Sequence, residues 1–398
     1  MAKPLQIALV HPENADNVRV WSGTPFFMKR AVEKHLGRVV DLSPAPVNTL
    51  KWKILSKGTS LLIRKKAPYD HLRAYSRELA KYFRPLLLKR LYDLIVAPGA
   101  RESIALLDTD IPIITYSDAT WDAVVDYYSV YSNLLAKARI DGEYLEQSAI
   151  DKSALFLYSS DWAADSARNH YHADPAKVHT FYLGANLMNP PTREEVLPRK
   201  LGKRIRLLLV GVDWEIKGGA IVLQVLKGLI DRGCDARLTV VGFTAPRGVE
   251  HPQMEVIPFL NKQIPEERKR FERAWRDADF FILPSRFEAA GLVFCEASAY
   301  ALPILAARTG GIPSIVKEGK NGFTIPHDEE PEGYIEKIIW FVEHPDQYAQ
   351  LSLSARIEYE NRLNWDTWGT RLAEVVSERF PEFRERIEYH RDQALSLT

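Results

Sequence analysis

The chain has 398 residues, of which 46% are hydrophobic and 26% charged, and its formal net charge is +1. This is the composition of an ordinary soluble globular protein, long enough for two or three domains, and its charge balance does not favour bulk nucleic-acid binding. Its two cysteines, Cys234 and Cys295, stand in apolar surroundings, which indicates a reducing compartment rather than a disulfide framework or a thiolate metal site.

The amino-terminal apolar run is too short for a signal peptide, and no run reaches the roughly 18 apolar residues that span a bilayer. We therefore expect a cytoplasmic protein. Short apolar runs alternate with helical patterns through the first half of the chain, which predicts parallel strands joined by crossover helices. The expected strands are residues 6–10, 38–42, 92–97, 111–116, 154–158 and 177–183.

The loop after the first strand leads through Ser22, Gly23 and Thr24 to Pro25. A helical pattern begins near Phe26. Pro25 suits a first helical turn, and Ser22 and Thr24 are candidate caps. The plain interpretation of this loop is a strand-to-helix connection.

Residues 51–90 hold twelve Lys or Arg but only two acids, Asp70 and Glu78. A stripe of apolar residues at helical spacing, Leu72, Tyr75, Leu79, Tyr82 and Leu86, has basic residues beside it. A basic amphipathic helix of this kind is typical of a membrane-surface element, and an anionic membrane is one expected partner. The alternative is a helix that faces the core and keeps its basic face in solvent. Nucleic acid is not an expected partner, because no binding motif accompanies the charge.

Other polar residues of the first half favour structural roles. Asp108-Thr109-Asp110 precedes a strand, so we interpret it as a turn and not as a metal-binding pair. Asp118 follows a strand and faces its carboxyl end, where it either contacts a ligand or caps the next helix. His170 and His172 have no third ligand near them in the sequence, and His at a helix end suits the helix dipole. No metal is expected.

The proline-rich, charged stretch 187–204 predicts an interdomain linker. Strands are expected at residues 205–210, 238–242, 254–258, 281–283 and 303–307. Helices are expected at residues 264–278, 331–344, 346–362 and 365–380. After the strand 205–210, a loop from Gly211 to Gly219 carries Lys217 at the start of a helix, a suitable place for binding a diphosphate. The alternative for Lys217 is an ordinary surface lysine.

The chain is organised around residues 281–326, which read as strand, loop, helix and strand. Glu288 lies in the loop, where ligands of parallel sheets bind. Gly291 opens the helix, whose first N–H groups suit a phosphate. Glu296 lies in an otherwise apolar helix, where a carboxylate needs hydrogen-bond donors such as two vicinal sugar hydroxyls. On chemistry alone, a sugar-nucleotide site and a pair of purely structural glutamates remain equally open.

The stretch from Pro284 to Phe323 resembles the signature of retaining glycosyltransferases of family 4. The shared features are Glu288-AAGLVFC-Glu296, the preceding PS, and the following GGIPSIVKEGKNGF. The resemblance implies an α/β protein of the GT-B type, with two Rossmann-like βαβ domains whose parallel sheets face each other across a cleft. It covers the second domain strongly and the first weakly. The implied parts are an acceptor-side domain at 1–186, the linker 187–204, a nucleotide-sugar domain at 205–364, and helices at 365–398 that return to the first domain.

The resemblance also implies roles for individual residues. Glu288 lies against the donor sugar, Glu296 binds the ribose hydroxyls, and Lys217 with the helix start at Gly291, Leu292 and Val293 stabilises the leaving diphosphate. The loop at Gly23 closes over the donor phosphate, and Asp118 stands at a place near the donor sugar or acceptor. This sequence departs from the family pattern in that Val212 replaces an Arg of the phosphate clamp and Ser117 replaces a His before Asp118.

The expected function is metal-independent transfer of a sugar, with retention, from a nucleotide-diphosphate sugar to a glycan, a lipid-linked compound or another hydroxyl acceptor. The alternatives are a nucleotide-sugar epimerase on the same fold and a non-catalytic family member that binds a membrane or protein through residues 51–90. A dinucleotide-dependent oxidoreductase is disfavoured, since no G-x-G-x-x-G turn follows the first strand. No cofactor is expected beyond the substrate nucleotide.

Overall fold

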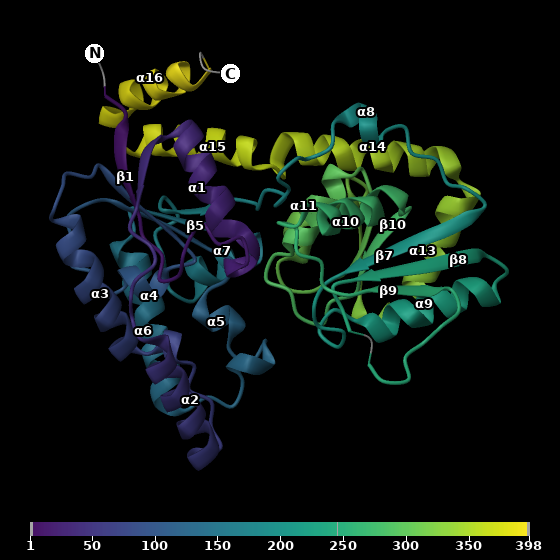
Figure 1. Cartoon of the computed structure of the whole chain (residues 1–398), viewed down its shortest axis with the longest axis horizontal. Helices are drawn as coiled ribbons and strands as arrows, with labels where there is room; N and C mark the ends of the chain where they lie inside the picture. Colours follow the sequence, from purple (N-terminus) through teal and green to yellow (C-terminus); the bar gives the residue numbers. More distant parts are fainter. Residues whose placement is uncertain (1–2, 245, 396–398) are drawn as a thin grey trace. The chain divides into compact units, whose positions relative to one another are not determined.

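The computed structural model describes residues 3–244 and 246–395, and the chain forms two compact units (Figure 1). The first unit extends to Tyr182 and resumes at Trp365, and the second unit is Leu183–Asn364. Each unit contains its own six-stranded sheet, and all strand pairs are parallel. The predicted fold class, an α/β protein with two Rossmann-like parallel sheets, is confirmed.

The sheet of the first unit has the strand order β2-β1-β3-β4-β5-β6. Two of its inner strands, β3 and β5, are apolar and buried along their whole length, as expected for a parallel sheet covered on both faces. The strands are β1 (Leu5–Leu9), β2 (Gly37–Asp41), β3 (Leu94–Pro98), β4 (Ile113–Ser117), β5 (Leu155–Tyr158) and β6 (Val178–Thr180).

The helices of the first unit include two that come from the carboxyl-terminal part of the chain. The α-helices are α1 (Thr24–His35), α2 (Thr49–Ile63), α3 (Arg73–Leu87), α4 (Arg101–Ile104), α5 (Trp121–Val124), α6 (Ala136–Lys152), α7 (Asp161–Asn169), α15 (Trp365–Arg379) and α16 (Arg384–Leu395). Helix α15 packs against α1, with the rings of Phe27 and Trp365 stacked at a centroid distance of 6.4 Å. This packing makes the last helices part of the first unit.

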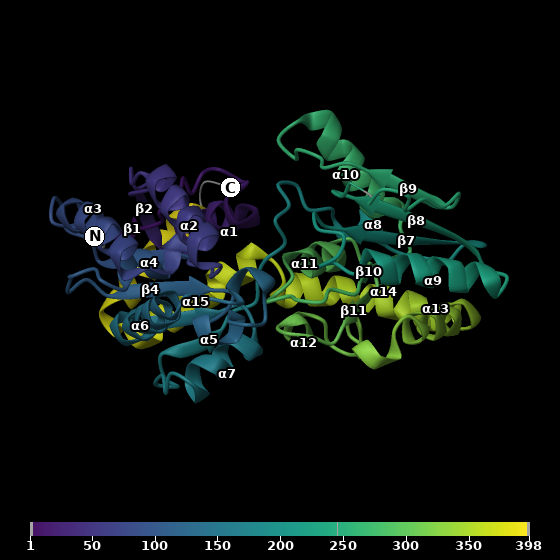
Figure 2. The same ribbon diagram turned by 90° about the horizontal axis from the view of Figure 1, so that it is seen from below.

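The sheet of the second unit has the order β12-β11-β10-β7-β8-β9, and the strands from β9 to β11 follow one another in this order in Figure 2. Figure 1 shows α9 and α13 on one face of it and α10, α11 and α14 on the other. The strands are β7 (Arg204–Val210), β8 (Asp235–Val241), β9 (Met254–Ile257), β10 (Phe280–Leu283), β11 (Ile304–Ala307) and β12 (Gly322–Ile325). The helices are α8 (Arg193–Val196), α9 (Gly219–Asp231), α10 (Pro265–Asp277), α11 (Leu292–Ala299), α12 (Ile312–Ile315), α13 (Glu332–Glu343) and α14 (Pro345–Arg362).

Strand β12 is not evident from the sequence, because this short run starts at Gly322 and lies among turn residues. The boundary between the units at Tyr182 comes four residues before the expected one at residue 186. The backbone N–H of Ala185 donates to the carbonyl of Leu363 at 3.0 Å, so this segment is held by the second unit. The stretch 187–204 likewise lies in the second unit and contains α8.

The apolar stripe predicted within residues 72–86 forms α3, and it faces the core of the first unit. Tyr75 and Leu79 are buried, as are the neighbouring Phe83 and Leu87. The interpretation of this stripe as a membrane-facing surface is therefore wrong: its apolar face is already covered by protein. Within the described ranges, no helix combines the length and the apolar character needed to cross a membrane.

Helix α2 differs from α3. Trp52 is its only buried residue, whereas six large apolar side chains are exposed. These are Leu50, Ile54, Leu55, Leu61, Leu62 and Ile63. The far end of α2 projects from the body of the first unit (Figure 1). Most of the exposed apolar surface of the basic region thus lies on α2, which the stripe did not include.

Candidate functional site

The candidate site lies where the second sheet changes its winding direction. Strands β7 and β10 are neighbours, β8 and β9 continue on one side, and β11 and β12 continue on the other. Loops that leave two such central strands diverge to opposite faces, which opens a binding place at the carboxyl edge of the sheet. The two loops here are residues 211–218 after β7 and residues 284–291 after β10.

The loop after β7 brings Lys217 to this edge. Two backbone hydrogen bonds shape it, from Lys217 N to the carbonyl of Asp213 at 3.0 Å and from Gly218 N to that of Glu215 at 3.2 Å. Gly218 has φ of 72°, and a Cβ there would lie 2.2 Å from the carbonyl oxygen of Pro284. Only glycine allows this conformation together with this close approach. The two loops are therefore packed directly on each other.

Glu288 and Lys217 form an ion pair across the junction of the loops. The distance from Lys217 Nζ to Glu288 Oε2 is 2.5 Å, and the side chains are 21% and 13% exposed. The backbone also holds Glu288, because its carbonyl accepts from Gly311 N at 3.0 Å. The ammonium and the carboxylate are thus placed together, partly shielded from water and accessible at the sheet edge.

Helix α11 starts directly after the Glu288 loop. Its N-cap is Gly291, with φ of 83° and no side-chain cap, and a Cβ there would lie 2.3 Å from the ring of Phe294. Leu292 and Val293 form the first turn and are half-buried. The first N–H groups of a helix carry partial positive charge and suit an anion. The predicted helix start therefore lies on the same loop as the predicted carboxylate.

Glu296 is in the second turn of α11, and its side chain is 4% exposed. Its Oε1 lies 2.7 Å from the Nζ of Lys262, a half-exposed residue in the turn between β9 and α10. The sequence analysis missed Lys262. The sequence does indicate that Glu296 needs a partner, since a carboxylate in an apolar helix requires a cation or hydrogen-bond donors. It does not indicate which residue is that partner, because Lys262 is distant along the chain.

Two neighbours of the site bear on the missing arginine of the phosphate clamp. Val212, where the family pattern has an Arg, is 72% exposed. Arg286 lies in the Glu288 loop, and its backbone N–H donates to the carbonyl of Ile216 at 2.8 Å. Its guanidinium is paired with the buried carboxylate of Glu330. The loop's arginine therefore already has a protein counter-ion.

Cys295 also lies in α11, where its thiol donates to the carbonyl of Leu183 at 3.2 Å. Burial raises the pKa of the Cys295 thiol to about 12. It is thus protonated at neutral pH, and it is not a nucleophile.

Gly23 and Asp118 belong to the first unit. Gly23 is the N-cap of α1 with φ of 88° and no side-chain cap bond, so the predicted capping by Ser22 or Thr24 is wrong. Pro25 does lie in the first turn. Glycine adopts this left-handed conformation without strain, which allows the sharp turn into α1.

Asp118 does not cap the following helix. The cap of α5 is Thr120, whose Oγ1 accepts from Ala123 N at 3.2 Å. The Oδ2 of Asp118 instead accepts from the indole N–H of Trp21 at 3.2 Å. Trp21 comes from the loop after β1, so Asp118 is tied to the loop that carries Gly23.

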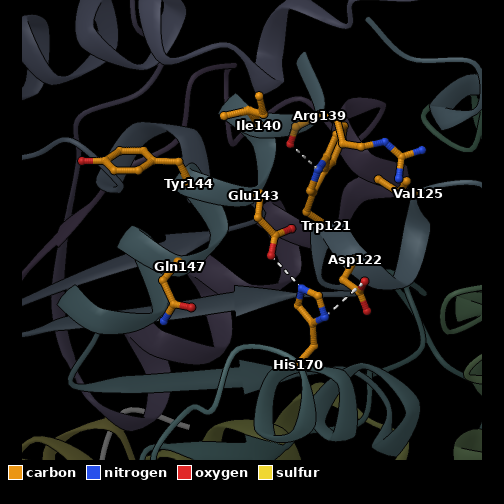
Figure 3. Close-up of a pocket in the computed structure, with 9 residues that line it drawn as sticks. All are labelled: Trp121, Asp122, Val125, Arg139, Ile140, Glu143, Tyr144, Gln147 and His170. Carbon is orange, nitrogen blue, oxygen red and sulfur yellow. Dashed lines mark hydrogen bonds and ion pairs between the residues drawn. The ribbon is translucent and has the colours of Figure 1, made fainter. Parts of the chain in front are cut away.

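A cavity of about 530 Å³ lies elsewhere in the first unit, between α5, α6 and the end of α7 (Figure 3). His170, the C-cap of α7, stands between two carboxylates, 2.6 Å from Glu143 Oε1 and 3.4 Å from Asp122 Oδ1. The part of the chain that the structure describes holds no group of three or more acidic, His or Cys side chains suited to a metal ion. None of the predicted site residues lines this cavity.

Comparisons with known proteins agree with this arrangement. Residues 204–344, which span the candidate site, match the family model described as glycosyl transferases group 1. A D-inositol 3-phosphate glycosyltransferase of Streptomyces scabiei is 27% identical over 271 residues, which are 64% of this chain and 60% of that protein. The chain thus spans about 60% of the length of such curated relatives.

Solved structures match over nearly the whole chain. Sucrose-phosphate synthase from Thermosynechococcus elongatus aligns with a TM-score of 0.66 and 13% identity, covering 95% of this chain and 100% of that one. Anabaena HepE in complex with UDP-glucose aligns with a TM-score of 0.59 and 16% identity, covering 94% and 100%. The two sheets and the site at the switch point of the second define a GT-B-like protein. Residues 204–344, which carry the site, are similar to the glycosyl transferases group 1 family, as the sequence signature indicates.

Proposed function

We propose that this protein is a retaining glycosyltransferase that moves a sugar from a nucleotide-diphosphate sugar to a hydroxyl acceptor. The observation that carries the proposal is the meeting of Lys217, Glu288 and the start of α11 at one switch point, with Glu296 one turn further into the helix. An ammonium and a helix start suit a diphosphate, and two carboxylates suit sugar hydroxyls. The second unit is the proposed donor side and the first unit the acceptor side.

In the proposed reaction, the bond from the anomeric carbon to the diphosphate breaks, and its electron pair goes to the diphosphate oxygen. A new bond forms from the acceptor oxygen on the same face of the sugar. The acceptor proton passes to the leaving phosphate oxygen, so no side chain is assigned as general base. Lys217 and the N–H groups at Gly291 to Val293 stabilise the growing charge, with Gly23 of the first unit as a further phosphate contact. These groups supply positive charge without a metal ion.

Glu288 has a different role from Glu296 in this proposal. Its carboxylate holds the ammonium of Lys217 and is partly accessible, with 13% of the side chain exposed, so it is placed to orient sugar hydroxyls beside the diphosphate. It also favours positive charge developing at the anomeric carbon, since an anion nearby stabilises a cationic centre. Asp118 is the proposed contact of the first unit with sugar or acceptor. Its bond to Trp21 fixes one carboxylate oxygen.

Calorimetry with UDP, GDP, ADP and dTDP tests the donor site. We expect wild type to bind one of them, and UDP is the first candidate because the similar HepE structure contains UDP-glucose. Glu296→Ala should weaken that binding about 100-fold, since it removes hydrogen bonds to a charged group. Glu266→Ala, at an 81% exposed carboxylate on α10, is the control and should change nothing. Folded wild type that binds none of the four nucleotides would contradict the proposal.

The acceptor class separates transfer from the related alternatives. Release of nucleoside diphosphate together with a new glycoside supports a transferase. Conversion of the nucleotide sugar to its epimer with no acceptor present would identify an epimerase instead. No turnover with any sugar of the bound nucleotide would leave a binding protein without catalysis.

We also propose that α2 docks the first unit on an anionic lipid surface. Residues 49–66 contain six basic residues and no acid, beside the six exposed apolar side chains of α2. Exposed apolar side chains with flanking cations suit the boundary between acyl chains and acidic headgroups. An acceptor anchored in lipid would then be presented to a protein already at the membrane.

Sedimentation with phosphatidylcholine vesicles, with and without phosphatidylglycerol, tests this surface. Wild type should bind the acidic vesicles, and high salt should weaken the binding. Replacing Leu61 and Leu62 by Ser should reduce it about tenfold or more, because both side chains are more than 80% exposed and available for burial. Leu353→Ser, at an exposed leucine of α14, is the matched control. The role of α2 would be contradicted if the double variant bound acidic vesicles as well as wild type does, or if wild type did not bind them.

A further inference from the structure

The contact of Lys262 with Glu296 changes what the candidate ribose site is able to recognise. One carboxylate oxygen, Oε1, receives the ammonium at 2.7 Å. Among the described residues, the Glu296 side chain makes this one hydrogen bond, to Lys262. A carboxylate whose first oxygen is already paired with a cation presents mainly its second oxygen, Oε2, to a ligand.

Lys262 is held in place by its turn and by an aromatic ring. Asn261 organises the turn, because its carbonyl accepts from Ile264 N at 2.9 Å and its Oδ1 accepts from Gln263 N at 3.1 Å. The Nζ of Lys262 lies 4.4 Å from the ring centroid of Phe271, within the range of a cation–π contact. The lysine side chain remains 38% exposed. It is therefore fixed at the border of the site, with one side towards solvent.

A paired ammonium and carboxylate form a neighbouring donor and acceptor. An ammonium has three N–H donors and no acceptor, and Glu296 uses one of them. Two vicinal hydroxyls match such a pair if one hydroxyl donates to the carboxylate and its neighbour accepts from the ammonium. Because the pair is neutral overall, the buried carboxylate does not need a second cation when the ligand binds.

We infer that Lys262 and Glu296 together read the ribose of the donor, and that the site selects ribonucleotides over 2′-deoxyribonucleotides. This inference rests on the proposed function. One of the 2′ and 3′ hydroxyls donates to Glu296 Oε2, and the other accepts from Lys262. A dTDP-sugar, which lacks the 2′ hydroxyl, is then a poor donor, and the donor class narrows to sugars linked to UDP, GDP or ADP.

A purely structural role for Lys262 predicts a different result. As a counter-ion only, Lys262 would hold the Glu296 carboxylate in position, and its loss would weaken the binding of all nucleotides by the same factor. As a direct contact, Lys262 contributes to nucleotide affinity only when the ribose hydroxyl that it binds is present. Analogues that lack one hydroxyl therefore separate the two roles.

The test measures the affinity of the ribonucleoside diphosphate that wild type binds best among UDP, GDP and ADP, and of its 2′-deoxy and 3′-deoxy forms. Wild type should bind each deoxy form about tenfold or more weakly, the value of one hydrogen bond to a charged group. Lys262→Met should bind the parent nucleotide about tenfold more weakly and should lose the discrimination against one of the two deoxy forms. It should keep discrimination against the other, which reports on Glu296. Lys262→Arg should restore much of the lost affinity, since it keeps a charged donor.

Lys269→Met is the matched control, because Lys269 also pairs with a glutamate but lies on the exposed face of α10. It should leave all three affinities unchanged. An equal loss for all three nucleotides in Lys262→Met, or no loss, would overturn the inference while the proposed function stands. Absence of binding by folded wild type would instead remove the proposed function, and this inference with it.

Discussion

Glu288→Gln is expected to bind UDP more tightly than wild type and yet to lose nearly all sugar transfer. The carboxylate of Glu288 neutralises the ammonium of Lys217 at 2.5 Å. A diphosphate must share or displace this counter-ion. The glutamine keeps the shape and removes the charge, so Lys217 is released for the phosphate.

The gain in affinity is expected to be about fivefold, in line with about 1 kcal/mol for a partly exposed ion pair. It should shrink as salt is added, because salt screens the charges. Turnover should fall by about 100- to 1000-fold, since the variant loses the charge that supports the anomeric centre in the transition state. Calorimetry gives the first quantity, and initial rates with the sugar nucleotide give the second.

Glu215→Gln is the matched control for Glu288→Gln. It lies in the same loop as Lys217, its side chain is exposed, and the substitution removes the same charge. It should change neither affinity nor turnover by more than about twofold, as is usual for an exposed charge. If Glu288→Gln bound UDP more weakly than wild type, Glu288 would not compete with the diphosphate for Lys217. If the variant kept full activity, its charge would not be needed for sugar transfer.

Gly218→Ala is expected to disrupt both the stability of the second unit and nucleotide binding. The added Cβ would lie 2.2 Å from the carbonyl oxygen of Pro284, and the residue would keep φ of 72°. Left-handed backbone costs a non-glycine residue about 1–2 kcal/mol, and overpacking adds about 1–3 kcal/mol. The loop relieves the clash by moving away from Pro284, which displaces the neighbouring Lys217.

We expect chemical denaturation to show that Gly218→Ala has a free energy of unfolding of the second unit about 3 kcal/mol lower than wild type. This loss combines the cost of the left-handed backbone with the cost of overpacking. Nucleotide affinity should fall about tenfold or more, as expected when a charged contact is lost. The control is Gly233→Ala, at a position with φ of 81° where an added Cβ meets nothing within 4 Å. It carries only the backbone cost, and nucleotide binding should be unchanged. A Gly218→Ala protein as stable as Gly233→Ala would mean that the two loops are not tightly packed.

Much of the fold was predictable because several of its strands are fully apolar. The runs of β5 and β10 are buried along their whole length, and a short apolar run between turn residues predicts a buried strand. Strand β12 was missed because its run is short and begins with glycine. The spacing from Glu288 to Glu296 was also readable, since a loop and the helix that follows it keep such residues close.

The α2 surface shows why burial was harder to predict than periodicity. The stripe of α3 has clear helical spacing, and a core-facing helix and a membrane-facing helix share that pattern. Only the packing of Leu79 and Phe83 into the core separates the two. Apart from Trp52, the large apolar residues of α2 are exposed in the described structure, and the spacing along the chain carries no information about that difference.

By itself, the sequence determined the fold class, the resemblance to a family and the residue types proposed to meet a donor, because these depend on local apolar runs and on a motif contained within forty residues. The tertiary structure decided the partners of those residues. Lys262 reaches Glu296 across 34 positions, Lys217 reaches Glu288 across 71, and Trp21 reaches Asp118 across 97. Such pairs form where the carboxyl ends of parallel strands converge at one edge, and that convergence exists only once the sheets have formed.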